Sequence, residues 1–304
     1  MVTNLICPAA TGMDFSIPSS QLKEGRVNLI GFPFDGTACF KKGARLAPDT
    51  IREHLQHIES YSPYLEKDLL EIEPINDIGN IVYLKEPIDY QNKELIDQSW
   101  SNAQNVFSEL TQNFNLKSAN TKMLCLGGEH SISINPISLY LKNYEDLVLI
   151  QLDAHADLRD AWTGFSYSHA SIIKNCTDLF GVDHQLIQYG IRSGTAEEFK
   201  WMKKNNTRLS HCEALIEKIH SLPNQTPIYL TLDLDFLDPA VFPGTGTPEA
   251  GGESFNNLIR ILKALNSKNL IAADIVELAP NIDRTGISSI VATTVFRELL
   301  LLLA

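Results

Sequence analysis

The sequence predicts an α/β fold with a central, mainly parallel sheet that is flanked by helices on both faces. Three observations lead to this prediction. Short apolar runs alternate with amphipathic helical patterns, as in folds that bury a parallel sheet between helices. Several runs end abruptly in glycine, histidine or carboxylate residues. Ligands of open α/β sheets bind beyond the carboxyl ends of the strands, so these residues stand where a site is expected.

The predicted strands are near-continuous apolar runs, at residues 27–30, 123–126, 147–152, 186–189, 228–232 and 270–276. Strands that are buried on both faces have this composition, because neither face meets solvent. The run at 228–232 is too apolar for an exposed edge strand. The predicted helices cover about 48–61, 93–114, 255–265 and 288–303. Pro48 and Asp49 suit a first helical turn, and Ser254 is a candidate N-cap.

Length and composition fit one large α/β domain that spans residues 1–304, with 44% hydrophobic and 20% charged residues. A net charge of −12 argues against nucleic acid as a partner and is compatible with a small cationic substrate. The five cysteines show no disulfide or zinc-binding spacing, which favours a cytoplasmic location. Residues 1–13 lack the pattern of a signal peptide, and the apolar stretch 299–304 is too short to span a membrane.

Six candidate metal ligands follow the predicted strands. They are His130, Asp153, His155, Asp157, Asp233 and Asp235. In an extended segment, residues two apart point the same way, so Asp153, His155 and Asp157 are expected to share one face, as are Asp233 and Asp235. Carboxylates crowded together raise one another's pKa and resist ionising together. Two divalent cations remove that conflict. Carboxylate and imidazole together suit Mn, Fe, Co or Zn, and among these a set rich in oxygen ligands without thiolate favours Mn.

These motifs resemble those of the ureohydrolase family, which includes arginases and agmatinases. The similarity rests on Gly127-Gly128-Glu129-His130-Ser131, Asp153-Ala154-His155-Ala156-Asp157 and Asp233-Leu234-Asp235, and it extends from Gly31 to the last helix. The resemblance implies a three-layer, arginase-like α/β fold with two Mn(II) ions per chain. One ion would take His130, Asp153, Asp157 and Asp233, and the other would take Asp153, His155, Asp233 and Asp235. It also implies a homo-oligomer, commonly a trimer or a hexamer.

The resemblance assigns roles to further residues. The two cations would activate a water for attack on a guanidinium carbon. Asp157 would orient that water, Glu277 would bind the guanidinium through paired N–H bonds, and His169 would carry protons. The products would be urea and an amine, which is putrescine if the substrate is agmatine.

Several segments resemble the agmatinase branch, including residues 31–37, 61–65, 190–194 and 243–247. The stretch Ser166-Tyr167-Ser168-His169 differs from the Ser-Gly-Asn of arginases, which favours a substrate without an α-carboxylate. Arg159 beside the pocket could bind a carboxylate and is a further candidate substrate-binding residue. Therefore 4-guanidinobutyrate stays open as a substrate, together with arginine and aminopropylagmatine. Cys39-Phe40-Lys41-Lys42 departs from the commoner agmatinase pattern and leaves the substrate's tail undefined.

Two other classes compete with this interpretation. A deacetylase-type amidohydrolase shares a related fold but uses a single zinc, and Asp153, Asp157 and Asp235 argue against it. A catalytically silent metal-binding interaction protein is the second alternative. Glu277 and His169, beside a complete ligand set, favour an enzyme instead.

Overall fold

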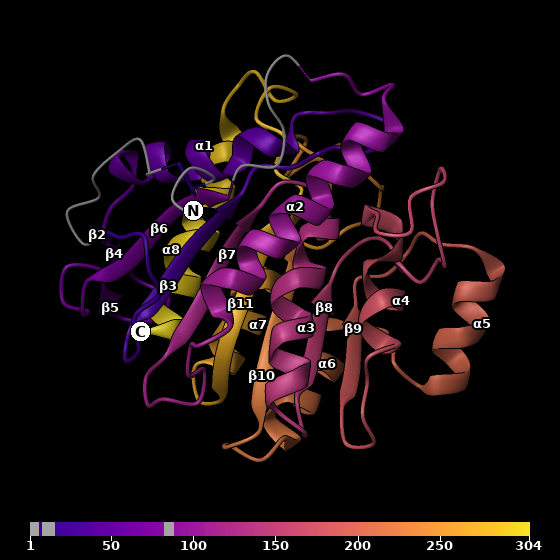
Figure 1. Ribbon diagram of the computed structural model, residues 1–304. Coiled ribbons are helices and arrows are strands. Elements are labelled where there is room, and N and C mark those ends of the chain that lie inside the picture. The colour runs from indigo at the N-terminus through magenta and orange to yellow at the C-terminus, as the bar shows by residue number, and fades with distance from the viewer. Residues whose placement is uncertain (1–5, 8–15, 82–87) are drawn as a thin grey trace.

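The computed structural model describes residues 6–7, 16–81 and 88–304, and it confirms the predicted α/β architecture. Strands of the described residues form one nine-stranded sheet at the centre of the molecule, and helices cover both of its faces (Figure 1). The sheet order is β1-β6-β3-β7-β11-β10-β8-β9, with β2 beside β6. All pairs within this sheet are parallel except β1 with β6.

The strands that position the site lie next to one another in the middle of the sheet. Their bounds are β7 Lys122–Gly127, β11 Asn269–Val276, β10 Pro227–Asp233 and β8 Val148–Leu152. The flanking strands are β1 Ile6–Cys7, β2 Ser16–Pro18, β3 Val27–Phe32, β6 Ile75–Ile81 and β9 Gln185–Tyr189. A separate pair consists of β4 Tyr61–Ser62 and β5 Lys67–Asp68.

Two apolar cores attach the helices to the two faces of the sheet. One core includes side chains of α1 Ala47–His54, α6 Cys212–Ser221, α7 Phe255–Leu265 and α8 Ile287–Leu303. The other includes α2 Lys93–Thr111, α3 Ile134–Asn143, α4 Ile172–Thr177 and Met202 of α5 Ala196–Asn205. Since each helix buries one apolar stripe against the sheet, the result is the three-layer arrangement that the sequence predicts.

All six predicted strands are confirmed, with bounds that differ by one or two residues. The helices predicted at 93–114, 255–265 and 288–303 are confirmed as α2, α7 and α8. The helix predicted at 48–61 is shorter, because α1 ends at His54 and the 3-10 turn η3, Leu55–His57, follows it. Helices α3 to α6 and strand β6 were not predicted. The sequence stretch 1–13 lies outside the described residues apart from 6–7.

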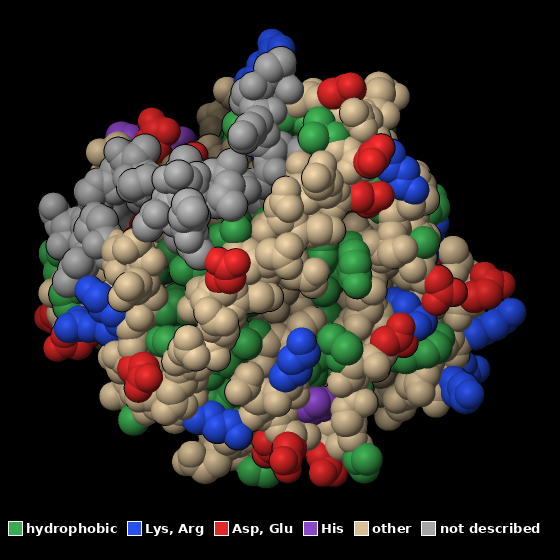
Figure 2. Space-filling model, in the orientation of Figure 1, with side chains coloured by type: hydrophobic (Ala, Val, Ile, Leu, Met, Phe, Trp, Pro, Cys, Tyr) green, Lys and Arg blue, Asp and Glu red, His purple; other side chains and the backbone are tan. Residues whose placement is uncertain are grey.

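Charged side chains are dispersed over the face that carries α2 and α3. Figure 2 shows acidic and basic groups scattered singly or in small groups over the described part of this face. Cys39, Cys125, Cys176 and Cys212 are free thiols. Among the described residues, no helix combines the length and the apolar character that are needed to cross a lipid bilayer.

Candidate active site

The candidate ligands meet at the carboxyl edge of the four central strands. His130 begins the 3-10 turn η4, His130–Ser133, just beyond β7. Asp153 follows β8, and Asp233 is the last residue of β10. Because β7, β11, β10 and β8 are consecutive in the sheet, residues that are up to 147 positions apart come together here. This is the edge at which ligands of parallel α/β sheets bind.

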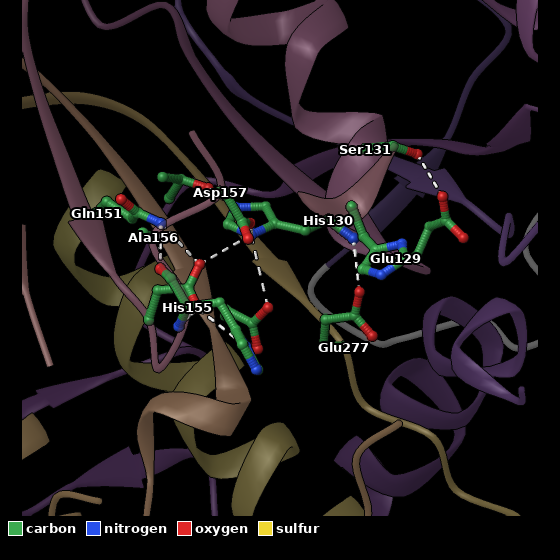
Figure 3. A network of polar contacts seen from close by, with 12 residues as sticks. Glu129, His130, Ser131, Gln151, His155, Ala156, Asp157 and Glu277 are labelled. Carbon is green, nitrogen blue, oxygen red and sulfur yellow. Dashed lines mark hydrogen bonds and ion pairs between the residues drawn. The ribbon is translucent and has the colours of Figure 1, made fainter. Parts of the chain in front are cut away.

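One group of ligands surrounds the fully buried imidazole of His130. Its Nδ1 atom lies 3.1 Å from Asp153 Oδ2, 3.1 Å from Asp157 Oδ2 and 3.5 Å from Asp233 Oδ2. Figure 3 shows Asp157 directed toward the His130 ring. One nitrogen and two carboxylate oxygens therefore form a compact donor group, and the Asp233 oxygen lies slightly farther from the nitrogen.

A second group forms around His155. Its Nδ1 atom lies 2.8 Å from Asp235 Oδ2 and 3.7 Å from Asp153 Oδ1. Two triads can each hold a metal ion by their geometry, His130 with Asp153 and Asp157, and His155 with Asp153 and Asp235. Asp153 belongs to both triads. The two triads together contain five of the six predicted ligands, and the shared position of Asp153 agrees with a bridging role. Asp233, the second predicted bridge, belongs to neither triad and lies 3.5 Å from His130 Nδ1.

The local backbone differs from the extended segments that the sequence analysis assumed. Asp235 lies in the 3-10 turn η6, Leu234–Phe236, and its N–H donates to Asp233 Oδ1 over 2.8 Å. Asp157 has a φ of 54°, in the left-handed region. The expectation that alternation along a strand aligns these ligands is wrong for these two residues. Their side chains converge because tight turns at the strand ends redirect them, and backbone strain of this kind concentrates at functional sites.

Two carboxyl groups of the cluster hold their protons more tightly than usual, whereas contacts of Asp235 with His155 and the Ala154 N–H outweigh its burial and lower its pKa. Burial, followed by the neighbouring Asp153, raises the pKa of Asp157 to about 7. Burial, followed by Asp235 and Asp153, raises the pKa of Asp233 well above its usual range. For His155 burial favours the neutral ring, but the carboxylates of Asp235, Asp153 and Asp157 together outweigh burial and raise the pKa to about 10. Positive charge is therefore what this cluster lacks.

Two atoms show that the donors suit a metal ion. His130 Nδ1 and Asp235 Oδ2 are buried and have no hydrogen-bond partner. Such atoms are costly in a protein interior. Each lies within about 3 Å of another atom that can offer a lone pair to a metal ion, which is the arrangement of ligands that face a common cation. Imidazole and carboxylate together suit a divalent metal ion, and the two triads contain no thiolate.

Glu277 stands directly beside the His130 group, just beyond β11. Its Oε1 atom accepts a hydrogen bond of 2.8 Å from the backbone N–H of His130 (Figure 3). Its own N–H donates to Gly128 O over 2.9 Å, and Gly128 is a glycine because a Cβ there would lie 1.9 Å from Phe34 O. Glu277 has a φ of 66°. Burial, followed by the nearby Glu129, raises the pKa of Glu277 well above its usual range, so a cationic ligand would stabilise its ionised form.

His169 lies on the other side of the pocket, at the start of the turn η5, His169–Ser171. Its Nδ1 atom is 3.3 Å from Thr37 Oγ1. Thr37 donates its hydroxyl proton to the buried Glu129, which also accepts from the Ser131 hydroxyl over 2.7 Å. Burial, followed by the positive charge of His155, lowers the pKa of His169 to about 3. The ring is therefore neutral near pH 7, and its protonated form is disfavoured while His155 carries a positive charge.

A cavity of about 190 Å³ opens over the cluster. Its lining includes Cys39, His155, Asp157, Arg159, Trp162, His169 and Thr247. The Arg159 guanidinium stacks 4.0 Å from the centre of the Trp162 ring, and its Nε atom lies 3.8 Å from Glu198 Oε2. Arg159 is thus part of the pocket wall, with its charge partly balanced. A larger cavity of about 460 Å³ lies beside β9 and α5 and contains none of the predicted site residues.

Sequence reasoning missed the polar residues that support the ligands. His130 Nε2 lies 2.8 Å from Thr231 Oγ1, and Thr231 donates to Asp274 Oδ1 over 2.8 Å. Gln151 Nε2 donates to Asp153 Oδ2 over 2.8 Å. One signal was available: Asp274 and Thr231 are polar residues inside apolar runs, and a buried polar residue in a central strand calls for a partner.

Comparisons with known proteins agree with this fold. The model of the arginase family matches residues 25–302, and the chain belongs to that family. It is 35% identical to the agmatinase of Bacillus subtilis over 297 residues, which cover 96% of this chain and 97% of that one. It is 34% identical to the N(1)-aminopropylagmatine ureohydrolase of Thermococcus kodakarensis, with 88% of this chain and 87% of that one covered. The crystal structure of agmatine ureohydrolase from Thermoplasma volcanium matches with a TM-score of 0.70 at 26% identity, over 96% of this chain and 91% of that chain.

Proposed function

We propose that this arginase-family protein is an agmatinase-type ureohydrolase, which hydrolyses agmatine to putrescine and urea with two manganese ions per chain. The observation that carries the proposal is the pair of metal-binding triads that share Asp153, with Glu277 hydrogen-bonded to the backbone of His130 beside them. Agmatinase relatives that align over nearly the whole chain support agmatine as the substrate. We further propose that residues 1–304 act as one domain, in a cytoplasmic homo-oligomer.

The ligand groups define where the cations would sit. His130, Asp153, Asp157 and Asp233 would hold one Mn²⁺, and Asp153, His155, Asp233 and Asp235 would hold the other. Bound manganese would supply Lewis acidity that lowers the pKa of water toward neutrality. Two doubly charged ions would also offset the carboxylate charge that keeps the pKa of Asp157 and Asp233 high.

Glu277 would hold the reacting end of the substrate. A carboxylate accepts two parallel N–H bonds from a guanidinium, and this fixes the plane of the group that is attacked. Oε1 of Glu277 is already anchored by the His130 N–H, so the position of the guanidinium is set relative to the metal ligands. Exclusion of water around the buried Glu277 strengthens that ion pair.

Asp157 and His169 would handle the protons of the reaction. The attacking water bonds to the guanidinium carbon, and the bond from that carbon to the alkyl nitrogen breaks. The Asp157 carboxylate would orient the water and pass its proton toward the leaving amine. Neutral His169, whose Nε2 atom is not the one that faces Thr37, would carry a proton between the amine and the pocket opening.

The tail of the substrate would lie along the wall formed by Arg159 and Trp162. Glu198 and the Trp162 ring already engage the Arg159 guanidinium, which weakens its attraction for a carboxylate. This removes one reason to expect the acid tails of 4-guanidinobutyrate and arginine.

A parallel substrate series tests the proposal. Purified protein loaded with Mn²⁺ is offered agmatine, aminopropylagmatine, 4-guanidinobutyrate and arginine, and released urea is measured. We expect the highest kcat/KM with agmatine, and two manganese ions per chain by elemental analysis. Urea from another substrate alone would move the assignment to that guanidino compound. Absence of urea from all four would overturn the enzymatic proposal and leave a metal-binding protein, and one zinc per chain would indicate the deacetylase class.

A further inference from the structure

Behind the ligand cluster lies a buried chain of polar side chains for which the proposed reaction has no use. Thr231 and Asp274 are paired residues of the neighbouring parallel strands β10 and β11. Thr231 Oγ1 lies 2.8 Å from His130 Nε2 on one side and 2.8 Å from Asp274 Oδ1 on the other. The Tyr229 hydroxyl donates to the second oxygen of Asp274, also over 2.8 Å. Every member of this chain is fully buried.

Counting protons along the chain shows which nitrogen of His130 carries the proton when the ring binds a cation as a neutral imidazole. A threonine hydroxyl has one proton, and an ionised carboxylate only accepts hydrogen bonds. Thr231 therefore gives its proton to Asp274, and its oxygen offers only lone pairs to His130. The contact with Nε2 is then a hydrogen bond only if Nε2 carries the proton. A neutral imidazole has a single N–H, so Nδ1 is left with a free lone pair.

That lone pair is directed at the ligand cluster. Nδ1 is the nitrogen that lies 3.1 Å from Asp153 and 3.1 Å from Asp157, and it has no hydrogen-bond partner. The opposite tautomer would place a proton where a cation has to bind. The expulsion of that proton, or rotation of the ring, would then weaken the binding of any divalent ion.

We propose that Asp274, acting through Thr231, is a positioning residue that holds His130 in the tautomer that binds metal and thereby sets the metal affinity of the site. This inference rests on the proposed metal-dependent function. The proposed role also explains why the sequence has an aspartate at position 274, where burial of a carboxylate costs free energy. Asp274 is fully buried, and among its partners the Thr231 and Tyr229 hydroxyls do not neutralise it.

The decisive measurement is the affinity of metal-free protein for Mn²⁺, determined by titration for four variants. Thr231→Val keeps the shape of the side chain and removes the hydroxyl, and Asp274→Asn removes the charge. Both should weaken Mn²⁺ binding by about 10- to 100-fold, the usual loss when the partner of a metal-binding histidine is removed. Thr231→Ser retains the hydroxyl and should bind Mn²⁺ within about threefold of the wild type.

Tyr229→Phe is the matched control, because it removes a hydroxyl from the same carboxylate without touching Thr231. It should weaken Mn²⁺ binding less than Thr231→Val does. Thermal unfolding of each metal-free variant separates stability from affinity. A variant with a lower Tm but wild-type affinity for Mn²⁺ would show that the chain is only structural.

The outcomes distinguish this inference from the proposed function. If the wild type binds two manganese ions and releases urea, while Thr231→Val and Asp274→Asn bind Mn²⁺ as tightly, the inference is wrong and the function stands. If the wild type itself takes up no manganese, the proposed function fails first. Should Thr231→Val not fold, the comparison of Asp274→Asn with Tyr229→Phe gives the same decision.

Discussion

Two histidines of the pocket are each backed by a threonine and a buried carboxylate, but the two arrangements differ in tightness. In the first, Thr231 lies 2.8 Å from His130 Nε2 and donates to Asp274. All three residues are fully buried within or beside the central strands. In the second, Thr37 lies 3.3 Å from His169 Nδ1, and His169 is only half-buried on a turn. Glu129 takes the place of Asp274 as the carboxylate.

The difference matches the demands on the two rings. A metal ligand has to stay in one place, because small displacements weaken coordination. A proton carrier has to exchange partners during turnover, so a longer contact at the pocket wall suits it. The same three residue types, placed on rigid strands or on a loop, can therefore fix one imidazole and leave the other adjustable.

The largest effects on manganese content and urea release are expected when each histidine is replaced, and they test whether the two rings have different roles. His130→Asn should bind at most one manganese per chain and lose about 1,000-fold in kcat/KM, since several kcal/mol of charge stabilisation depend on the cations. His169→Asn should keep both ions and lose about 100- to 1,000-fold in kcat, with KM little changed. Elemental analysis and urea release measure the two effects.

The control for both substitutions is Asp183→Asn, which alters an exposed carboxylate and should leave metal content and urea release unchanged. If His169→Asn lost manganese to the same degree as His130→Asn, the two histidines would not have separate roles.

The next largest effect concerns the looser arrangement. Thr37→Val removes the oxygen that His169 Nδ1 faces and the donor to Glu129. We expect kcat to fall by about tenfold, at the level of one lost hydrogen bond, without loss of manganese. Thr37→Ser should restore kcat. Thr231→Val, by contrast, is expected to weaken Mn²⁺ binding. A loss of manganese in Thr37→Val would contradict the separate roles of the two threonines.

The two arrangements also show how far the sequence could be read. The ligands themselves were visible, because histidine and carboxylates stand at the ends of apolar runs such as 228–232. Their threonine partners were not, since Thr231 meets Asp274 only through the register of two strands. Thr37 reaches Glu129 across 92 positions of the chain. A polar residue inside an apolar run indicates that it has a buried partner, but which residue that partner is depends on the folded topology.

Strand β6 was missed for a related physical reason. Its sequence, Ile75–Ile81, contains the polar residues Asn76, Asp77 and Asn80, which are rare in strands. All three are buried. Arg52 of α1 makes this possible, because its guanidinium donates to both oxygens of Asp77 and, over 2.7 Å, to Asn80. A cation from a distant helix thus permits a strand that composition argues against.

A smaller effect is expected at the pocket wall. Arg159→Gln should raise KM by about three- to fivefold for agmatine and for 4-guanidinobutyrate alike, since the stacking on Trp162 is worth about 1 kcal/mol. Equal changes would mean that Arg159 shapes the wall without reading the charge of the tail. A selective loss of 4-guanidinobutyrate turnover would instead show that the Arg159 guanidinium binds the carboxylate tail of that substrate.

The smallest effect on Mn²⁺ binding is expected from the contact between His155 and Glu249, which is longer than the contacts of the two threonines. The His155 Nε2 atom lies 3.7 Å from Glu249 Oε1, beyond hydrogen-bond distance, and the Glu249 side chain is 41% exposed. Solvent screens such a contact, so Glu249→Gln should weaken Mn²⁺ binding by less than about fivefold. Ser193→Ala, which frees the same carboxylate from its 2.8 Å hydrogen bond, is the companion variant. If Glu249→Gln weakened Mn²⁺ binding as much as Thr231→Val, distance and burial would not be what separates a positioning carboxylate from a bystander.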